Sequence, residues 1–296
     1  MNLKPQPRPR RAPRVTRRRP AARSRGHGAR RPGTPLRRRF ARRLPSIGRV
    51  VAALGAAVVV AAMLGALNGP WLRITDVAWA GEQHTSAADI EAVLAAQRGA
   101  SALAVDTGEV SDRLEALPAV AEASVTVSLT GRVEASIVEH EAAFVWETRS
   151  MRFLGAIDGT LFAVLGAGEE SPALAHVRDE RSGARLIAVG DQVPDGVLRT
   201  ALALFAIDPA ALGSKATHLS VSIDDEFGFR LASSDPAWEA AFGVYGLDPS
   251  ESAAQAAARL ERQVTAVRTL FATERESDIL WLDVRNPGKV YFRANG

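Results

Sequence analysis

The longest uninterrupted apolar stretch predicts a membrane-spanning helix. Val50 to Leu67 runs for 18 residues without a charged side chain. As an α-helix it covers roughly 27 Å at about 1.5 Å per residue, against a hydrocarbon core about 30 Å thick. Uncharged residues extend it to Trp71, whose indole suits the headgroup region, and Arg49 can reach the opposite interface. We therefore expect a transmembrane helix over residues 50–71 with Arg49 and Trp71 as membrane anchors.

The segment after the span has the pattern of a strand followed by a helix. Residues 74–79 place Val77 and Trp79 on one face, and Gly81 ends the strand. Ser86 has Asp89 three residues later, a spacing that caps a helix and puts a carboxylate near its positive end. The next apolar residues recur at helical spacing: Ile90, Val93 and Leu94.

A second helix and a hairpin complete this unit. Thr107 is the expected cap of the helix, and Pro118 stops it. Gly131 turns the chain between two strands whose apolar and polar residues alternate. The resulting order is strand–helix–helix–strand–strand. The inward-facing residues are expected to be Val110, Leu114 and Leu117 in the helix, then Val125, Val127, Leu129, Val133, Ala135 and Ile137 in the strands.

The remaining residues predict mainly strands with packed helices. Residues 219–223 and 227–231 form a hairpin around the acidic turn 224–226. A helix is expected through residues 198–205, and a longer one over 250–271 carries a clear apolar face. Two short strands close the chain, so the fold class is α+β. The apolar face consists of Leu260, Val264, Val267 and Phe271.

Charge divides the chain at the apolar run. The first 49 residues hold 18 Lys and Arg and no Asp or Glu, whereas the rest holds 19 basic and 33 acidic residues, a net charge of −14. Arg-rich flanks resist transfer across a bilayer, so the N-terminus is expected in the cytoplasm and the acidic part outside. The tail, residues 1–49, is expected to be disordered because its charges repel and eight prolines break any helix.

The basic tail has two candidate ligands, anionic lipid and nucleic acid. Phe40 is its only aromatic residue, so no stacking platform accompanies the arginines, and lipid is favoured. The apolar run also has alternatives to an uncleaved anchor. Ala78-Trp79-Ala80 has the small-x-small pattern of a signal-peptide cleavage site, and Arg37-Arg38-Arg39-Phe40 resembles a twin-arginine export signal.

The sequence offers no catalytic constellation. Cysteine is absent, which excludes disulfides and cysteine-bound metals, and none of the five histidines has a second one at ligand spacing. Hydrolase, phosphate-loop and His-Glu-x-x-His motifs do not occur. The acidic turn 224–226 is better explained as a solvated hairpin than as a cation site. We therefore expect no cofactor, no metal, no small-molecule substrate and no enzymatic activity.

Three motifs in the first unit carry a family resemblance. They are Val77-x-Trp79-x-Gly81, Leu117-Pro118-x-Val120-x-x-Ala123-x-Val125, and Val133-x-Ala135-x-Ile137-Val138-Glu139. In this order behind one span, they resemble the POTRA domain of the bacterial division family FtsQ/DivIB. The resemblance implies a POTRA domain over residues 72–142 and an extracytoplasmic β domain with a packed helix over 143–296.

The resemblance also implies a function. It describes a single-pass scaffold at the division septum that binds other divisome membrane proteins of the single-pass coiled-coil type and links them to cell-wall synthesis. An edge strand could bind such a partner by its backbone. Val290, Tyr291, Phe292 and Arg293 are the candidates, with Tyr291 as the aromatic anchor. The alternatives are a POTRA-containing transport or assembly component and a twin-arginine-exported protein with another activity.

Overall fold

The apolar run forms one continuous helix. The structure, a computed structural model, describes residues 46–294 apart from 68, 167, 170, 172–173, 247–249 and 287. Helix α1, Ile47–Leu67, has 21 residues and covers about 32 Å. In the part of the chain that the structure describes, it is the one helix long and apolar enough to cross a membrane. This helix fits a single-pass membrane protein.

The two expected anchors lie at opposite ends of this stretch. Arg49 is an exposed residue of the first turn of α1, which begins three residues before Val50. Trp71 lies in a short 3-10 helix, Pro70–Leu72, and is 63% exposed. Residues 1–45 of the expected disordered tail lie outside the described residues.

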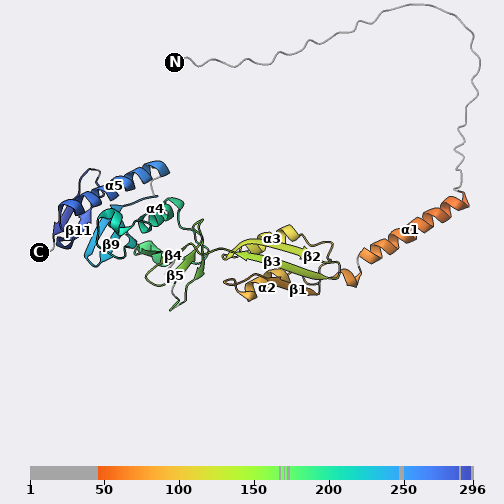
Figure 1. The fold of residues 1–296 in the computed structure, drawn as a ribbon. Helices are drawn as coiled ribbons and strands as arrows, with labels where there is room; N and C mark the ends of the chain where they lie inside the picture. Colours follow the sequence, from red (N-terminus) through yellow and green to blue (C-terminus); the bar gives the residue numbers. More distant parts are fainter. Residues whose placement is uncertain are drawn as a thin grey trace, which may run out of the picture. The chain divides into compact units, whose positions relative to one another are not determined.

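The unit after the span has the predicted order and forms a small α/β sandwich (Figure 1). Its sheet has the order β1-β3-β2, with β1 parallel and β2 antiparallel to the central strand β3. The two helices pack on one face of this sheet. The elements are β1 (Asp76–Ala80), α2 (Ala87–Ala95), α3 (Thr107–Glu115), β2 (Val120–Val127) and β3 (Arg132–Glu139).

The core of this unit is formed by the buried faces of its strands and its two helices. Strand β3 buries every second residue, and the helices bury residues three or four positions apart. Ser86 caps α2 as predicted, because its side chain accepts from the backbone N–H of Ala88. The buried residues include Ile90, Leu94, Val110, Leu114, Val125, Val133, Ala135 and Ile137.

Two local predictions in this unit were wrong. The cap of α3 is Asp106, whose carboxylate accepts from Gly108 N at 3.0 Å and from Glu109 N at 3.2 Å, so Thr107 is already helical. Leu129 is 66% exposed rather than inward-facing. The chain turns after β2, because Gly131 N donates to the carbonyl of Ser128, and this turn ends the alternation before Leu129.

The rest of the chain builds one nine-stranded sheet. Its strand order is β12-β11-β10-β9-β8-β7-β4-β5-β6, with parallel pairing at β10/β11, β7/β8 and β4/β7. Strands β7 and β10 were not predicted. The strands are β4 (Phe144–Glu147), β5 (Arg152–Gly155), β6 (Leu161–Val164), β7 (Ala175–Asp179), β8 (Ser220–Asp224), β9 (Gly228–Ser234), β10 (Ala237–Gly243), β11 (Ile279–Asp283) and β12 (Tyr291–Ala294).

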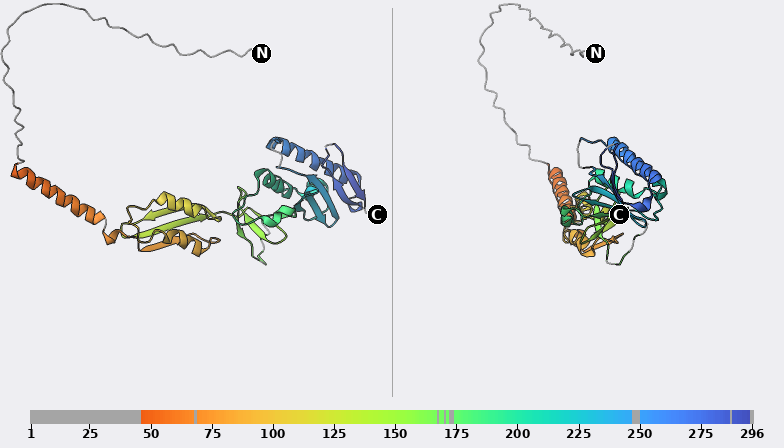
Figure 2. Two further views of the ribbon diagram at one scale, coloured as in Figure 1. Left: turned by 180° about the vertical axis from the view of Figure 1, so that it is seen from behind. Right: turned by 90° about the vertical axis from the view of Figure 1, so that its left-hand side faces the viewer.

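Two helices cover one face of this sheet. They are α4 (Asp195–Phe205) and α5 (Ala253–Thr273), and Figure 2 shows them from two further directions. Three 3-10 helices connect the elements: η2 (Ser182–Leu186), η3 (Pro209–Leu212) and η4 (Glu276–Asp278). Helix α5 begins with a capping box, in which Ser252 and Gln255 satisfy each other's backbone N–H groups.

The main hydrophobic core lies between the helices and the sheet. Val267 and Phe271 of α5 pack there with Val197 and Leu204 of α4, as the apolar face of α5 predicts. Every second strand residue points away from the helices, and polar side chains occupy the uncovered face in β7, β8 and β9.

We predict that Leu114→Ala lowers the free energy of unfolding by about 2–5 kcal/mol, because Leu114 is fully buried beside Val125 in the first core. Urea titration of the detergent-solubilised chain measures this change. Asp112→Ala, at an exposed position of the same helix, should stay within about 0.5 kcal/mol. Equal losses in the two variants would contradict the assignment of the helical face.

Candidate partner-binding edge

Strand β12 is the outermost strand at one end of the large sheet. It pairs antiparallel with β11, placing Tyr291 opposite Asp283, Phe292 opposite Leu282 and Arg293 opposite Trp281. All four of its residues are exposed. Its outer side faces no other strand among the described residues, so the backbone groups there are open to a further strand.

The opposite edge of the sheet is covered at the start of its last strand. Backbone groups of β6 bond to a neighbouring loop, since Leu161 N donates to Asp191 O at 2.9 Å and Gly190 N donates to Leu161 O at 2.7 Å. Thr160 forms a further bridge with Gln192. The two edges of one sheet therefore differ, and the uncovered one is β12.

The side chains of β12 offer contacts on both faces. Directly opposite residues of an antiparallel pair share a face, so Tyr291 and Arg293 lie on the uncovered face, with Asp283 and Trp281. Phe292 shares the helix-covered face with Leu282 but remains 46% exposed, and Tyr291 is 53% exposed. Val290, just before the strand, packs against the main core and holds the strand in place.

A polar and aromatic cluster supports the uncovered face beside this edge. Arg285 donates from Nε and Nη2 to the carboxylate of Asp283, at 3.0 and 2.7 Å. Hydrogen bonding from Arg285 holds the pKa of Asp283 below its usual value. The same guanidinium lies over the ring of Phe227. The rings of Phe227 and Trp281 pack edge to face, with 4.7 Å between their centroids. The Asp283–Arg285 pair thus belongs to a layered support beneath the edge.

Helix α5 is tied to the last strands from the other face. The amide of the buried Gln263 donates to the carbonyls of Phe242 and Val284, both at 2.9 Å, and accepts from the hydroxyl of Tyr245. Burial raises the pKa of Tyr245 to about 12, so this hydroxyl stays protonated and keeps donating. Both faces of β11 are therefore packed, which leaves β12 as the exposed layer.

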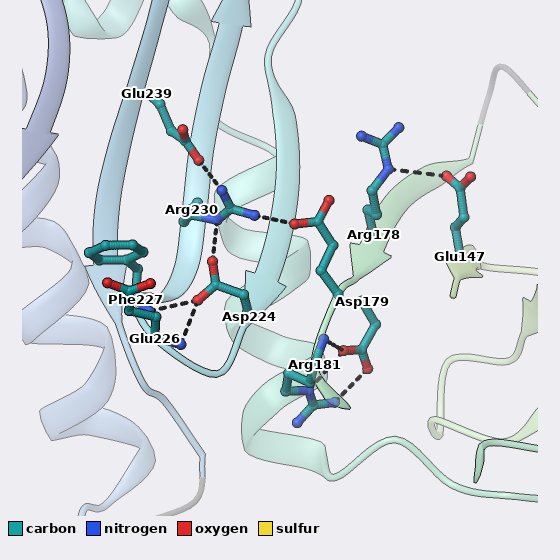
Figure 3. Close-up of polar contacts among 10 residues, drawn as sticks. Glu147, Arg178, Asp179, Arg181, Asp224, Glu226, Phe227, Arg230 and Glu239 are labelled. Atoms are coloured by element: carbon teal, nitrogen blue, oxygen red, sulfur yellow. Dashed lines mark hydrogen bonds and ion pairs between the residues drawn. The ribbon is translucent and has the colours of Figure 1, made fainter. Parts of the chain in front are cut away.

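Arg230 links three strand segments on the uncovered face. Its guanidinium meets Asp224 of β8, Glu239 of β10 and Glu180 just after β7, and Nε lies 2.8 Å from Asp224 Oδ2 (Figure 3). The Arg230 side chain is only 16% exposed. One positive charge on β9 thus pairs with carboxylates of β8, of β10 and of the residue after β7.

A second ionic group lies on the helix-covered face at the end of β7. Asp179 is fully buried and accepts from the indole of Trp146 at 3.1 Å. Arg181 donates to the same carboxylate from Nε at 2.9 Å and Nη2 at 2.6 Å. These bonds raise the pKa of Arg181 above its usual value. The carboxylate is fully occupied in bridging β4 and β7, so it has a structural rather than a chemical role.

The structure assigns the acidic turn 224–226 to backbone support. Asp224 Oδ1 accepts from the N–H groups of Glu226 at 2.9 Å and Phe227 at 2.6 Å, and Asp225 accepts from Ser182 N at 2.7 Å. In the described part of the chain, no group of three or more His, Asp or Glu could hold a metal ion.

Sequence reasoning missed the Arg230 network. The outward positions of β8 and β9 were visible from their alternation, and the hairpin joined Asp224 to Arg230. Glu239, however, lies in β10 and Glu180 directly follows β7, and neither strand was predicted. The available signal was a set of acidic residues at or next to the strands on either side of Arg230.

Replacing Arg230 should destabilise the sheet. We predict that Arg230→Met lowers the free energy of unfolding by about 2 kcal/mol or more, because three carboxylates then face one another without a counter-charge. Arg178→Met is the matched control, since the Arg178 side chain is 58% exposed and its one ion pair among the described residues is with Glu147, at 3.7 Å. Chemical unfolding of both variants tests this, and a loss no larger for Arg230 than for Arg178 would contradict it.

Comparison with known proteins identifies the first folded unit. Residues 72–140 match the family model described as POTRA domain, FtsQ-type. A search of curated proteins finds no match. The matched residues contain all five elements from β1 to β3, in the order that the sequence predicted. Residues 72–140 are an FtsQ-type POTRA domain, and its place behind one apolar helix is consistent with an FtsQ/DivIB-like protein.

Proposed function

We propose that this chain is a non-catalytic, membrane-anchored scaffold of the bacterial division machinery. It binds other single-pass division proteins and links them to septal cell-wall synthesis. The observation that carries the proposal is the FtsQ-type POTRA domain, which points to a division-protein family. POTRA domains mediate protein–protein interaction, so protein partners fit this assignment.

The proposed mechanism is addition of a partner strand to β12. An extended partner segment pairs with the outer N–H and C=O groups of Tyr291–Ala294. Its side chains then lie beside Tyr291 and Arg293 on one face and beside Phe292 on the other. Backbone pairing supplies affinity, and the two exposed aromatic residues supply specificity.

The charge division suggests the orientation. The basic tail stays in the cytoplasm against anionic lipid, and the acidic folded part lies outside, in the cell membrane at the septum. In this orientation β12 is available to extracytoplasmic parts of other membrane proteins. Arg49 and Trp71 anchor the helix at its two interfaces.

The orientation can be tested with protease. Protease added to intact spheroplasts should digest the folded part beyond Trp71 and leave a tag on the N-terminal tail protected. Immunoblots against tags at the two ends report the outcome. Digestion of the N-terminal tag, or a mature chain that begins near Gly81, would contradict the anchored orientation.

The edge mechanism can be tested with proline. Because proline has no N–H, Tyr291→Pro or Phe292→Pro, whichever N–H points outward, should abolish partner recruitment to mid-cell. Tyr291→Ala should weaken binding by about 2 kcal/mol or more if Tyr291 is the anchor. Fluorescence microscopy and pull-down with division proteins give the two readouts.

Two controls separate binding from folding. The proline variants should still unfold cooperatively, because β12 is the last strand of the sheet. Leu186→Ala removes an apolar side chain that is 78% exposed in η2. Because η2 lies between β7 and β8 in the chain, strands that are not neighbours of β12, this variant should leave recruitment unchanged. If deletion of residues 290–296 keeps both recruitment and pull-down, the edge mechanism is wrong, although another surface could still serve the scaffold.

A further inference from the structure

The end of the POTRA domain nearest α1 presents three exposed apolar side chains. Trp71 is 63% exposed, Leu103 is 56% exposed and Leu129 is 66% exposed. They come from three separate segments: the 3-10 helix after α1, the α2–α3 loop and the β2–β3 turn. We call these three side chains the proximal apolar patch.

Backbone hydrogen bonds bring the three segments together. Ala102 N donates to Leu72 O at 2.6 Å, which ties the α2–α3 loop to the residue after Trp71. Thr75 N donates to Gly131 O at 2.8 Å, which ties the β2–β3 turn to the same stretch. The turn approaches so closely that a Cβ on Gly131 would lie 2.3 Å from the carbonyl oxygen of Arg73. The patch is therefore a built surface rather than three unrelated side chains.

The composition of these loops is unusual for an exposed surface. Residues 99–105 contain no charged side chain and only one polar side chain, Ser101, and the turn 128–131 carries Ser128 and Thr130 but no charge. Arg73 lies between the two loops, bridged to Ser101, is exposed, and forms no ion pair with another described residue. An apolar centre beside a free cation suits the boundary between acyl chains and phosphates.

The length of the chain limits what can cover the patch. Helix α1 ends at Leu67, and Trp71 follows four residues later, at most roughly 14 Å away in extended chain. The headgroup layer is itself about 5–7 Å thick on each side of the hydrocarbon core. Because Leu72 and Thr75 are bonded to the other two loops, the whole patch stays within reach of the bilayer that holds α1.

We propose that the proximal apolar patch docks on the lipid surface. Trp71, Leu103 and Leu129 enter the interface of the bilayer leaflet nearest the POTRA domain, and Arg73 meets its phosphates. This contact would restrict the domain at its base, in addition to the covalent link through α1. It concerns lipid and is independent of the protein partner proposed for β12.

The absence of cysteine makes a direct test simple. Single-cysteine variants Leu103→Cys and Leu129→Cys are labelled with a small fluorophore in the full chain, reconstituted in nanodiscs. Val138→Cys is the matched control, because Val138 is also 56% exposed but lies six residues beyond Arg132, roughly 20 Å along β3. Phosphatidylcholine with bromine atoms near the top of the acyl chains serves as the quencher.

Lipid contact predicts at least two-fold stronger quenching at positions 103 and 129 than at 138. Equal quenching at all three positions would overturn the proposal. So would labels that are shielded from water but not quenched by brominated lipid, because a neighbouring protein would then cover the patch.

A second arm separates affinity from tethering. A twelve-residue Gly-Ser insertion between residues 68 and 69 frees the domain from its short link. Quenching at positions 103 and 129 should persist if the patch binds lipid, and its loss would show that only the tether held it there. In the lengthened chain with Leu103→Asp and Leu129→Asp, a label at Thr130→Cys should lose its quenching, whereas retained quenching would overturn the role of the leucines.

Discussion

The large sheet depends on one guanidinium. Arg230 meets carboxylates from β8, β10 and the residue after β7, so one largely buried charge offsets three acidic side chains in the middle of the sheet. The cost of removing Arg230 would lie mainly in the acidic side chains left facing one another. Strand β12 is reached from this centre through β10 and β11. The Arg230 network and the proposed binding edge therefore belong to one continuous sheet.

The two edges of this sheet differ in how far their backbone groups are covered, and this difference favours a binding role for β12. Exposed edges tend to aggregate, and proteins usually cover or charge them. The loop carrying Gly190 and Asp191 covers β6. Strand β12 instead shows two aromatic residues and keeps its outer backbone open, supported by Asp283, Arg285 and α5 from both faces. A rigid support beneath an open edge favours strand addition, because little free energy is then lost in ordering β12 when a partner binds.

Local elements could be predicted from the sequence, whereas contacts between distant strands could not. The cap at Ser86 and the alternation at Val133 depend on a few neighbouring residues. The start of α3 was misplaced by one residue, because Asp106 and Thr107 are adjacent and both residue types can cap a helix. Strand β10 was missed, since its small residues Ala237, Ala240 and Ala241 carry a weak pattern. Without β10, Glu239 had no predicted place, and the Arg230 network could not be assembled.

Several buried polar side chains are engaged within the fold. Asp179, Asp224 and Glu239 each hold an arginine, and Gln263 uses its amide on two carbonyls. Such engaged groups stiffen a scaffold but are poorly placed to exchange protons with a substrate. What stays open is of another kind: a strand backbone at β12 and uncharged loops at the base of the POTRA domain. Both suit contact with large partners, a polypeptide at β12 and a lipid surface at the base of the POTRA domain, as the two proposals require.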